Sequence, residues 1–227
     1  MDLPSIRTRI DRLSEQIVGR LKDRSYFPHN SAIYRVGGVT IAGGDPTSFL
    51  EYSLAGLERY HASLGRYSYP EQSPLRSTPP AEIPVQRVVE TIAIPQTELH
   101  VWEALLAYYE QLLPQLCSAG EDPQTYGETV YVDADLLVRL HERMIIGRYV
   151  AHTKAERYPD VLQLLHDPEA LRAALVDPAR EQLVLANAAM LAEKYRLPAP
   201  LVQEVFAWIM QQTLALEVRY LRQVHGA

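Results

Sequence analysis

The stretch from Ile6 to Phe27 reads IRTRIDRLSEQIVGRLKDRSYF, and it decides the fold class. After Ile6, its apolar residues recur at intervals of four, three, four and four positions, at Ile10, Leu13, Ile17 and Leu21. Such intervals place the side chains on one face of an α-helix. Asp2 and Pro4 precede the pattern and are typical of a helix start. The stretch therefore predicts an amphipathic helix that buries one face.

Helical periodicity continues along most of the chain, and no segment has the alternation of a strand. We expect three further helices, beginning at Asp45-Pro46, running from about Thr97 to Leu116, and running from Asp133 to about Arg157. An aspartate cap followed by proline recurs at Asp167-Pro168 and Asp177-Pro178, and Pro198 and Pro200 start a last helix. The sequence thus predicts an all-α protein, with one domain of packed helices over residues 1–227.

Residues 69–95 are rich in proline and interrupt the helical pattern. An ordered excursion and a flexible loop both remain open for this segment. A linker between two domains is not expected, because neither flank has enough apolar helices to fold alone.

Composition excludes several classes of function. The formal net charge of -6 argues against a nucleic-acid partner, whose phosphates call for a basic surface. A single cysteine, Cys117, favours a reducing compartment. No run of about 18 apolar residues occurs, so we expect no membrane span. With no apolar signal core before the first helix, we expect the protein to be cytoplasmic.

Arg143 and Lys154 are the first candidates for a binding site. They lie eleven residues apart in a predicted helix, about three turns, so both project from nearly the same face. Gly147, Val150 and Ala151 between them are small enough to leave room above the helix. Two cations above small residues suit an anionic ligand, although a solvated basic face explains the spacing at least as well.

The other polar candidates also have structural explanations when taken singly. Thr213 and Glu217 lie one turn apart in the last helix, as at the edge of a solvent face. Asp177 is a natural helix cap, and Glu181 stands in the first helical turn, where the dipole favours a carboxylate. The seven histidines are scattered without metal-ligand spacing, so no metal site is expected.

Four blocks of sequence together resemble the all-helical chorismate mutase family, in its longer form known from yeast and plants. The blocks are Ile6–Phe27, SFLEYSLAGLERYHASLGRY (48–67), HERMIIGRYVAHTK (141–154), and the segment from DPARE (177–181) to TLALEVRYL (213–221). Each block alone is only a modest match to the family, but the four blocks in this order and at these spacings are specific for it.

The resemblance assigns roles to eight positions. Arg7, Arg143 and Lys154 match the three cations that bind substrate in the family, and Glu181 and Glu217 match its two glutamates. Asp177 and Thr213 match further substrate-binding positions, and Arg180 matches an arginine of the short bacterial forms. The implied activity is the rearrangement of chorismate to prephenate, in phenylalanine and tyrosine biosynthesis, without a cofactor. In that role Glu217 donates a hydrogen bond and must be protonated.

The resemblance also implies a homodimer with an amino-acid effector site between the subunits. Gly127 and Arg66 match that site. Glu128 stands where a serine is expected, Gly65 replaces an arginine, and Tyr131 fills a small-hydroxyl position. A carboxylate there disfavours the carboxylate of an amino acid, so we expect feedback control to be weak or absent.

Two alternative functions remain open. A helical homologue that has lost catalysis would act as a binding or regulatory protein, and it would be expected to have lost the polar residues of the site. A mutase acting on an amino-substituted chorismate would keep them. Asp177 and Glu181, which face the ring hydroxyl in the resemblance, favour chorismate itself.

Overall fold

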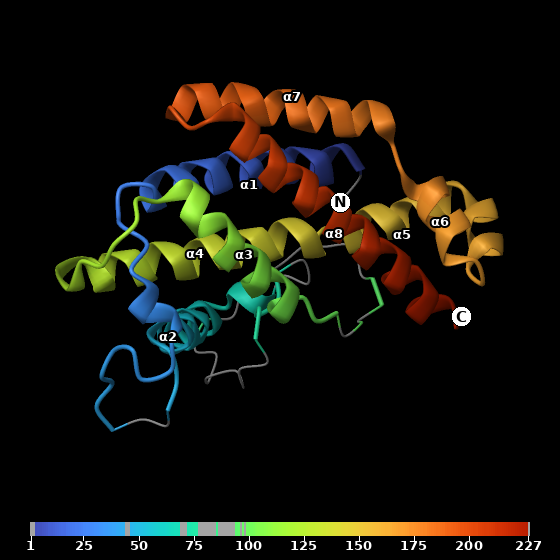
Figure 1. The fold of residues 1–227 in the computed structure, drawn as a ribbon. Helices are drawn as coiled ribbons and strands as arrows, with labels where there is room; N and C mark the ends of the chain where they lie inside the picture. The colour runs from blue at the N-terminus through green and yellow to red at the C-terminus, as the bar shows by residue number, and fades with distance from the viewer. Residues whose placement is uncertain are drawn as a thin grey trace. The chain divides into compact units, whose positions relative to one another are not determined.

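The computed structural model describes residues 3–43, 46–68, 72–76, 85, 94–95, 97 and 99–226. Every element within these residues is helical, so the all-α prediction is confirmed (Figure 1). The α-helices are α1 (Leu3–Arg24), α2 (Phe49–Ser63), α3 (Trp102–Leu116), α4 (Tyr126–Ile145), α5 (Gly147–Arg157), α6 (Pro168–Leu175), α7 (Pro178–Tyr195) and α8 (Ala199–His225). Across the described ranges, no helix combines the length and the apolar character needed to cross a membrane.

The chain forms two compact units. The first, called the site unit below, comprises Met1–Val18, Val89–His100 and Leu140–Ala227. The second, called the α2–α3 unit, comprises Gly19–Val88 and Val101–Arg139. The division falls inside α1 and α4, so each of these helices contributes to both units. One domain for the whole chain stays a prediction.

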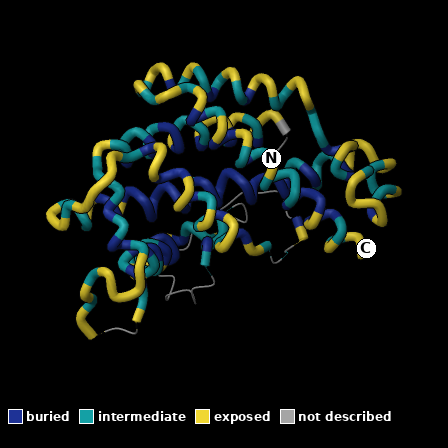
Figure 2. Tube along the Cα trace, viewed as in Figure 1, coloured by how far each residue is buried: buried dark blue, intermediate teal, exposed yellow. Residues whose placement is uncertain are grey.

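The site unit is organised around α8, which packs against α5, α6 and α7. Its core contains Tyr149 of α5, Leu171 of α6 and Leu221 of α8, all almost fully buried. Figure 1 shows α7 beside the N-terminal part of α1, with α8 running from the end of α7 past α5 and α6. The buried residues of α7 recur every fourth position, at Val184, Ala188 and Ala192, and its other faces remain more exposed (Figure 2).

The α2–α3 unit contains a buried ion pair. Arg24 Nε lies 2.7 Å from Asp133 Oδ1, and both side chains are fully buried. The hydroxyls of Tyr34 and Tyr109 donate to the same carboxylate at 2.6 and 2.5 Å. Arg24 also donates to the carbonyl oxygens of Phe27, Pro28 and His29, which fixes the segment after α1. These partners offset the cost of burying two charges.

Aspartate caps start α6 and α7 as predicted. Asp167 accepts hydrogen bonds from the backbone of Glu169 and Ala170, and Asp177 accepts one from Arg180, with proline next in each case. The predicted start at Asp45 was wrong. α2 begins at Phe49 because Ser48 and Glu51 form a reciprocal capping box, which supplies the partners that the first turn needs.

Two other predicted boundaries were also wrong. α3 begins at Trp102 rather than Thr97, and its cap, Val101, makes no side-chain hydrogen bond that a sequence pattern could reveal. The helix predicted from Asp133 starts earlier, at Tyr126, because Asp122 caps a short turn that opens with Pro123 and leads into α4. Only Ile146, which keeps right-handed helical dihedral angles, separates α4 from α5. Most of the proline-rich segment predicted at residues 69–95 lies outside the described residues.

Candidate active site

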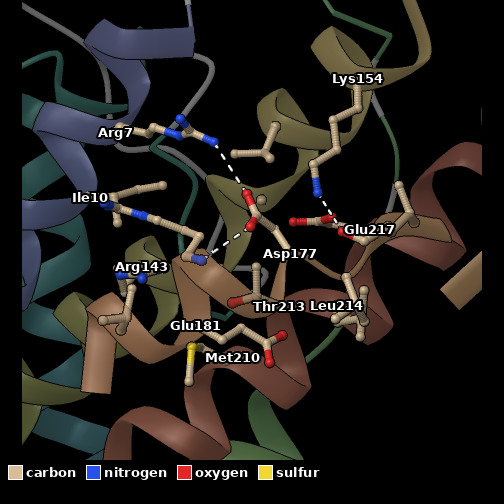
Figure 3. Close-up of a pocket in the computed structure, with 16 residues that line it drawn as sticks. Arg7, Ile10, Arg143, Lys154, Asp177, Glu181, Met210, Thr213, Leu214 and Glu217 are labelled. Carbon is tan, nitrogen blue, oxygen red and sulfur yellow. Dashed lines mark hydrogen bonds and ion pairs between the residues drawn. The ribbon is translucent and has the colours of Figure 1, made fainter. Parts of the chain in front are cut away.

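A pocket of about 110 Å³ opens in the site unit between α1, the end of α4, α5, α7 and α8. All eight residues predicted for a substrate site line it, namely Arg7, Arg143, Lys154, Asp177, Arg180, Glu181, Thr213 and Glu217. Figure 3 shows how side chains from these separate helices converge. The folded chain therefore brings together positions that are up to 210 residues apart, from Arg7 to Glu217.

Arg143 is the buried cation of the pocket, with 4% of its surface exposed. Its Nε donates to Ser14 Oγ at 3.4 Å. Burial, helped by the nearby charge of Arg180, lowers the pKa of Arg143 to about 10. The guanidinium is still charged at neutral pH, and a buried guanidinium fork suits a carboxylate that can bind it bidentately.

Two ion pairs position residues at the rim of the pocket. Arg7 lies 3.6 Å from the carboxylate of Asp177, and both side chains are partly exposed (Figure 3). Arg180 donates to Asp11 of α1 at 2.7 Å. Asp177 also accepts the hydrogen bond from the backbone of Arg180 that caps α7. One carboxylate thus starts the helix and stands beside a predicted substrate-binding cation.

Lys154 and Glu217 enter the pocket from α5 and α8. The Lys154 ammonium donates to the carbonyl oxygen of Leu175 at 2.5 Å. Burial raises the pKa of Glu217 to about 7, with Glu181 adding to the rise while Lys154 and Arg143 oppose it. Near neutral pH, a large share of Glu217 therefore carries a proton and can donate a hydrogen bond.

Gly147 allows α5 and α8 to approach closely beside the site. A Cβ at this position would lie 2.5 Å from Thr213 Cγ2, which is a clash, and 3.3 Å from Glu217 Oε1, which is a tight contact. The Thr213 hydroxyl donates to the carbonyl of Ile209 at 2.8 Å. Of the small residues predicted to leave room, Gly147 and Val150 line the pocket. Ala151 instead lies in the core of the site unit, so that part of the prediction was wrong.

The charges of the pocket suit a small dianion. Four cations line it, and Asp177 and Glu181 are two carboxylates. With Glu217 protonated, the lining carries two more positive than negative charges. Ile10, Val184 and Met210 add apolar walls to the pocket. In the part of the chain that the structure describes, no group of His, Cys, Asp or Glu side chains could hold a metal ion.

Asp11 and Ser14 are residues that sequence reasoning missed. They hold Arg180 and Arg143, respectively, and lie four and seven positions after Arg7 on α1. That spacing places all three on one helical face and is a signal that could have identified them.

Arg66 and Gly127, predicted as remnants of an effector site, belong to the α2–α3 unit and do not line this pocket. Arg66 begins a short 3-10 helix, Arg66–Ser68, and Gly127 is exposed in the first turn of α4. Their role between subunits stays a prediction.

The chain is an all-helical protein with a pocket whose charged lining suits a compact dianion. The family model for chorismate mutase type II matches residues 125–218, which include every residue predicted for the substrate site except Arg7. The chain is 27% identical over 241 residues to a chorismate mutase of Schizosaccharomyces pombe, covering 97% of this chain and 95% of that protein. The predicted resemblance is confirmed, since the chain is similar to chorismate mutases over nearly its whole length.

Solved structures agree with this relationship. The chain superposes on a Candida albicans chorismate mutase in complex with L-Trp with a TM-score of 0.88 at 24% identity, covering 98% of this chain and 91% of that one. It superposes on AtCM1 with tyrosine in an allosteric site with a TM-score of 0.87 at 25% identity, covering 99% and 96%. The described helices therefore have the arrangement of the chorismate mutase fold.

Proposed function

We propose that the protein is a chorismate mutase, an isomerase that converts chorismate to prephenate in phenylalanine and tyrosine biosynthesis. One observation supports this most strongly: all eight residues implied by the resemblance line a single pocket. The reaction is unimolecular. An ether C–O bond breaks while a C–C bond forms, and no atom leaves or enters. The pocket has only to select the folded conformer and stabilise the charge that develops.

Arg143 and Arg7 bind the two carboxylates of the substrate in this proposal. Arg143 is buried and held by Ser14, so its guanidinium is already oriented before substrate arrives. Arg7 is partly exposed and paired with Asp177 at 3.6 Å, so it can reorient at low cost. Thr213 adds a hydroxyl next to the same cavity. Holding both carboxylates of a flexible dianion keeps the substrate in its reactive conformer, and this lowers the entropic part of the activation barrier.

Lys154 and Glu217 stabilise the ether oxygen as the C–O bond breaks. That oxygen gains negative charge, and each preorganised donor aimed at it contributes about 3 kcal/mol in a site of this kind. Glu217 can serve only in its protonated form, because a carboxylate has no proton to donate. Its pKa of about 7 supports that role at neutral pH.

Asp177 and Glu181 accept the hydrogen bond of the ring hydroxyl. Asp177 caps α7 and Glu181 stands in its first turn, and both line the pocket. Each of these acceptors can take the hydrogen bond that the ring hydroxyl of chorismate donates. The chemistry requires no cofactor.

The test is the disappearance of chorismate, followed by its ultraviolet absorbance, with prephenate identified by NMR. Arg143→Ala should lower kcat/KM by at least about 100-fold, because it removes a buried charged partner of the dianion. Arg12→Ala is the matched control, since Arg12 is exposed on α1 and does not line the pocket. A folded wild-type protein without turnover would support the non-catalytic homologue. Faster turnover of an amino-substituted chorismate would support the other alternative.

We further propose a homodimer that works in the cytoplasm. Exposed aromatic side chains support self-association: Tyr52 and Tyr60 on α2 and Tyr131 on α4 all lie on the surface of the α2–α3 unit. The single cysteine fits a reducing compartment, and burial raises the pKa of the Cys117 thiol to about 11, so it is not poised as a nucleophile. Light scattering after size-exclusion chromatography measures the mass, and a monomer would contradict the dimer.

Feedback control by tyrosine or tryptophan at the subunit interface is proposed to be weak or absent. Glu128 is exposed next to Gly127 and would repel the carboxylate of either effector. A several-fold change in activity on addition of tyrosine or tryptophan would overturn this proposal.

A further inference from the structure

Arg180 lines the catalytic pocket but has no part in the proposed chemistry. Its side chain reaches from the first turn of α7 to α1, where Nη2 donates to Asp11 Oδ1 at 2.7 Å. The two side chains are 22% and 51% exposed. Asp11 does not line the pocket, so it holds this cation from outside the space that a substrate would occupy.

The charges of this ion pair are felt at Arg143, which binds a substrate carboxylate in the proposed function. Burial is the main cause of the lowered pKa of Arg143, Arg180 lowers that pKa further, and Asp11 opposes the fall. Both members of the pair therefore contribute to the electrostatic potential at the buried guanidinium. A change of charge at either position alters the attraction that a carboxylate bound there experiences.

The partners of Arg143 and Arg180 differ in charge. Arg143 is held by a neutral group, the hydroxyl of Ser14. Arg180 has a carboxylate beside it before any substrate binds. A substrate carboxylate that binds Arg180 must therefore compete with Asp11. Because the pair is partly exposed, this exchange of partners is cheap, but it still subtracts from the binding energy.

We propose that Asp11 determines the affinity of the pocket for its dianionic substrate, by keeping Arg180 in an ion pair with which the substrate has to compete. This inference rests on the proposed function and adds to it a residue outside the pocket. Prephenate is an isomer of chorismate and carries two carboxylates as well, so Asp11 weakens the binding of substrate and product alike. Such uniform weakening raises KM and leaves kcat nearly unchanged.

Asp11→Asn tests the charge of this residue without changing its shape. The amide oxygen can still accept a hydrogen bond from Arg180, so the cation keeps its position while its counter-charge is lost. We expect the KM for chorismate to fall by about 5-fold, with kcat within about 2-fold of the wild type, because a partly exposed ion pair has a modest energy. The variant should fold normally for the same reason. Steady-state kinetics at low ionic strength measures both constants, since salt screens exposed charges.

Glu15→Gln is the matched control for the loss of one negative charge. Glu15 lies one helical turn further along α1, and its partner Lys194 does not line the catalytic pocket. The KM of this variant should stay within about 2-fold of the wild type. In an Arg180→Gln background, Asp11→Asn should also change KM by less than about 2-fold, because Asp11 acts through Arg180.

Isothermal titration with prephenate gives a readout that needs no turnover. The Kd for prephenate should fall by about 5-fold in Asp11→Asn and stay unchanged in Glu15→Gln. An unchanged or raised Kd in Asp11→Asn would overturn the inference, and turnover by the wild type would still support the proposed function. An equal gain of affinity in Glu15→Gln, or an undiminished gain in the Arg180→Gln background, would also overturn it, because the overall charge and not the ion pair would then set the affinity.

The same titration separates this inference from the proposed function. A wild type that binds prephenate but does not turn over chorismate, and whose Asp11→Asn variant binds more tightly, would contradict the proposed function alone. A wild type that neither binds prephenate nor turns over chorismate would contradict both.

Discussion

Glu217 shows how one buried side chain links stability to catalysis. Its pKa is about 7 in the folded protein against an ordinary value of 4.5, chiefly because of burial. Between pH 4.5 and about pH 7, Glu217 is ionised in the unfolded chain but still protonated in the folded chain. Stability due to the neutral form is therefore complete at low pH and is lost as pH rises through about 7, a loss on the order of 3 kcal/mol.

Glu217→Gln should accordingly be more stable than the wild type at alkaline pH. Glutamine keeps the shape of the side chain and cannot ionise, so the variant avoids the cost of burying a charge. We expect its free energy of unfolding to exceed that of the wild type by about 2 to 3 kcal/mol at pH 8, with little difference at pH 5. Urea denaturation at the two pH values measures this. A stability difference independent of pH would contradict a raised pKa.

Gly147 is a second residue at which packing determines function. Gly147→Ala places a methyl group 2.5 Å from Thr213 Cγ2, so Thr213 and Glu217 must shift. We expect kcat/KM to fall at least about 10-fold, because small displacements of catalytic groups are costly. Gly56→Ala in α2 is the control. No atom lies within 4 Å of its new Cβ, and the change should stabilise the helix by about 0.5 to 1 kcal/mol. Unchanged kinetics in Gly147→Ala would contradict the close approach.

Among the helices, α6 and α7 begin with the same signal but differ in function. Asp167 and Asp177 each accept a backbone hydrogen bond and precede proline. Asp167→Ala and Asp177→Ala should each cost about 1 kcal/mol of stability, measured by denaturant unfolding.

Only Asp177→Ala should also impair turnover, because Asp177 lines the pocket beside Arg7. Asp177→Asn should retain the cap and recover most of the stability. Equal activities in the two alanine variants would show that Asp177 acts only as a cap.

The helix starts also show which elements a sequence can predict. The caps of α6 and α7 were predictable because side chain and proline are adjacent. The start of α4 used the same signal at Asp122-Pro123, and it was missed because a short turn lies between the cap and the helix. The start of α3 has no side-chain cap, so tertiary packing rather than a local signal sets it.

At the scale of the whole molecule, the residues of the catalytic pocket belong to the site unit, and the Arg24–Asp133 pair belongs to the α2–α3 unit. Asp133→Asn should therefore reduce stability by about 3 to 5 kcal/mol, because it leaves Arg24 charged and buried without its partner. The KM for chorismate in the folded fraction should stay unchanged.

Tyr109→Phe is the milder control for this network. It removes one of two hydroxyls that donate to Asp133 and should cost about 1 to 2 kcal/mol. Thermal unfolding monitored by circular dichroism compares the two variants. A larger loss in Tyr109→Phe than in Asp133→Asn would contradict the importance of the ion pair.

The all-α class followed from apolar periodicity alone, but the site did not. Arg143 and Lys154 lay in one predicted helix, so their spacing was informative, whereas Arg7 and Glu217 were brought together only by the resemblance. The pKa of Glu217 and the partners of the arginines were beyond prediction. They depend on burial and contacts between helices that are distant in sequence, such as Asp11 on α1 with Arg180 on α7.

The central claim is that a neutral, buried Glu217 donates to the breaking ether oxygen. The pH dependence of kcat/KM for chorismate in the wild type and in Glu217→Gln tests it most directly. In the wild type, kcat/KM should fall as pH rises through about 7, where Glu217 loses its proton. In Glu217→Gln, the alkaline fall should disappear, since the amide donates at every pH. An unchanged alkaline fall in the variant would contradict the claim, because another group would then be the one that titrates.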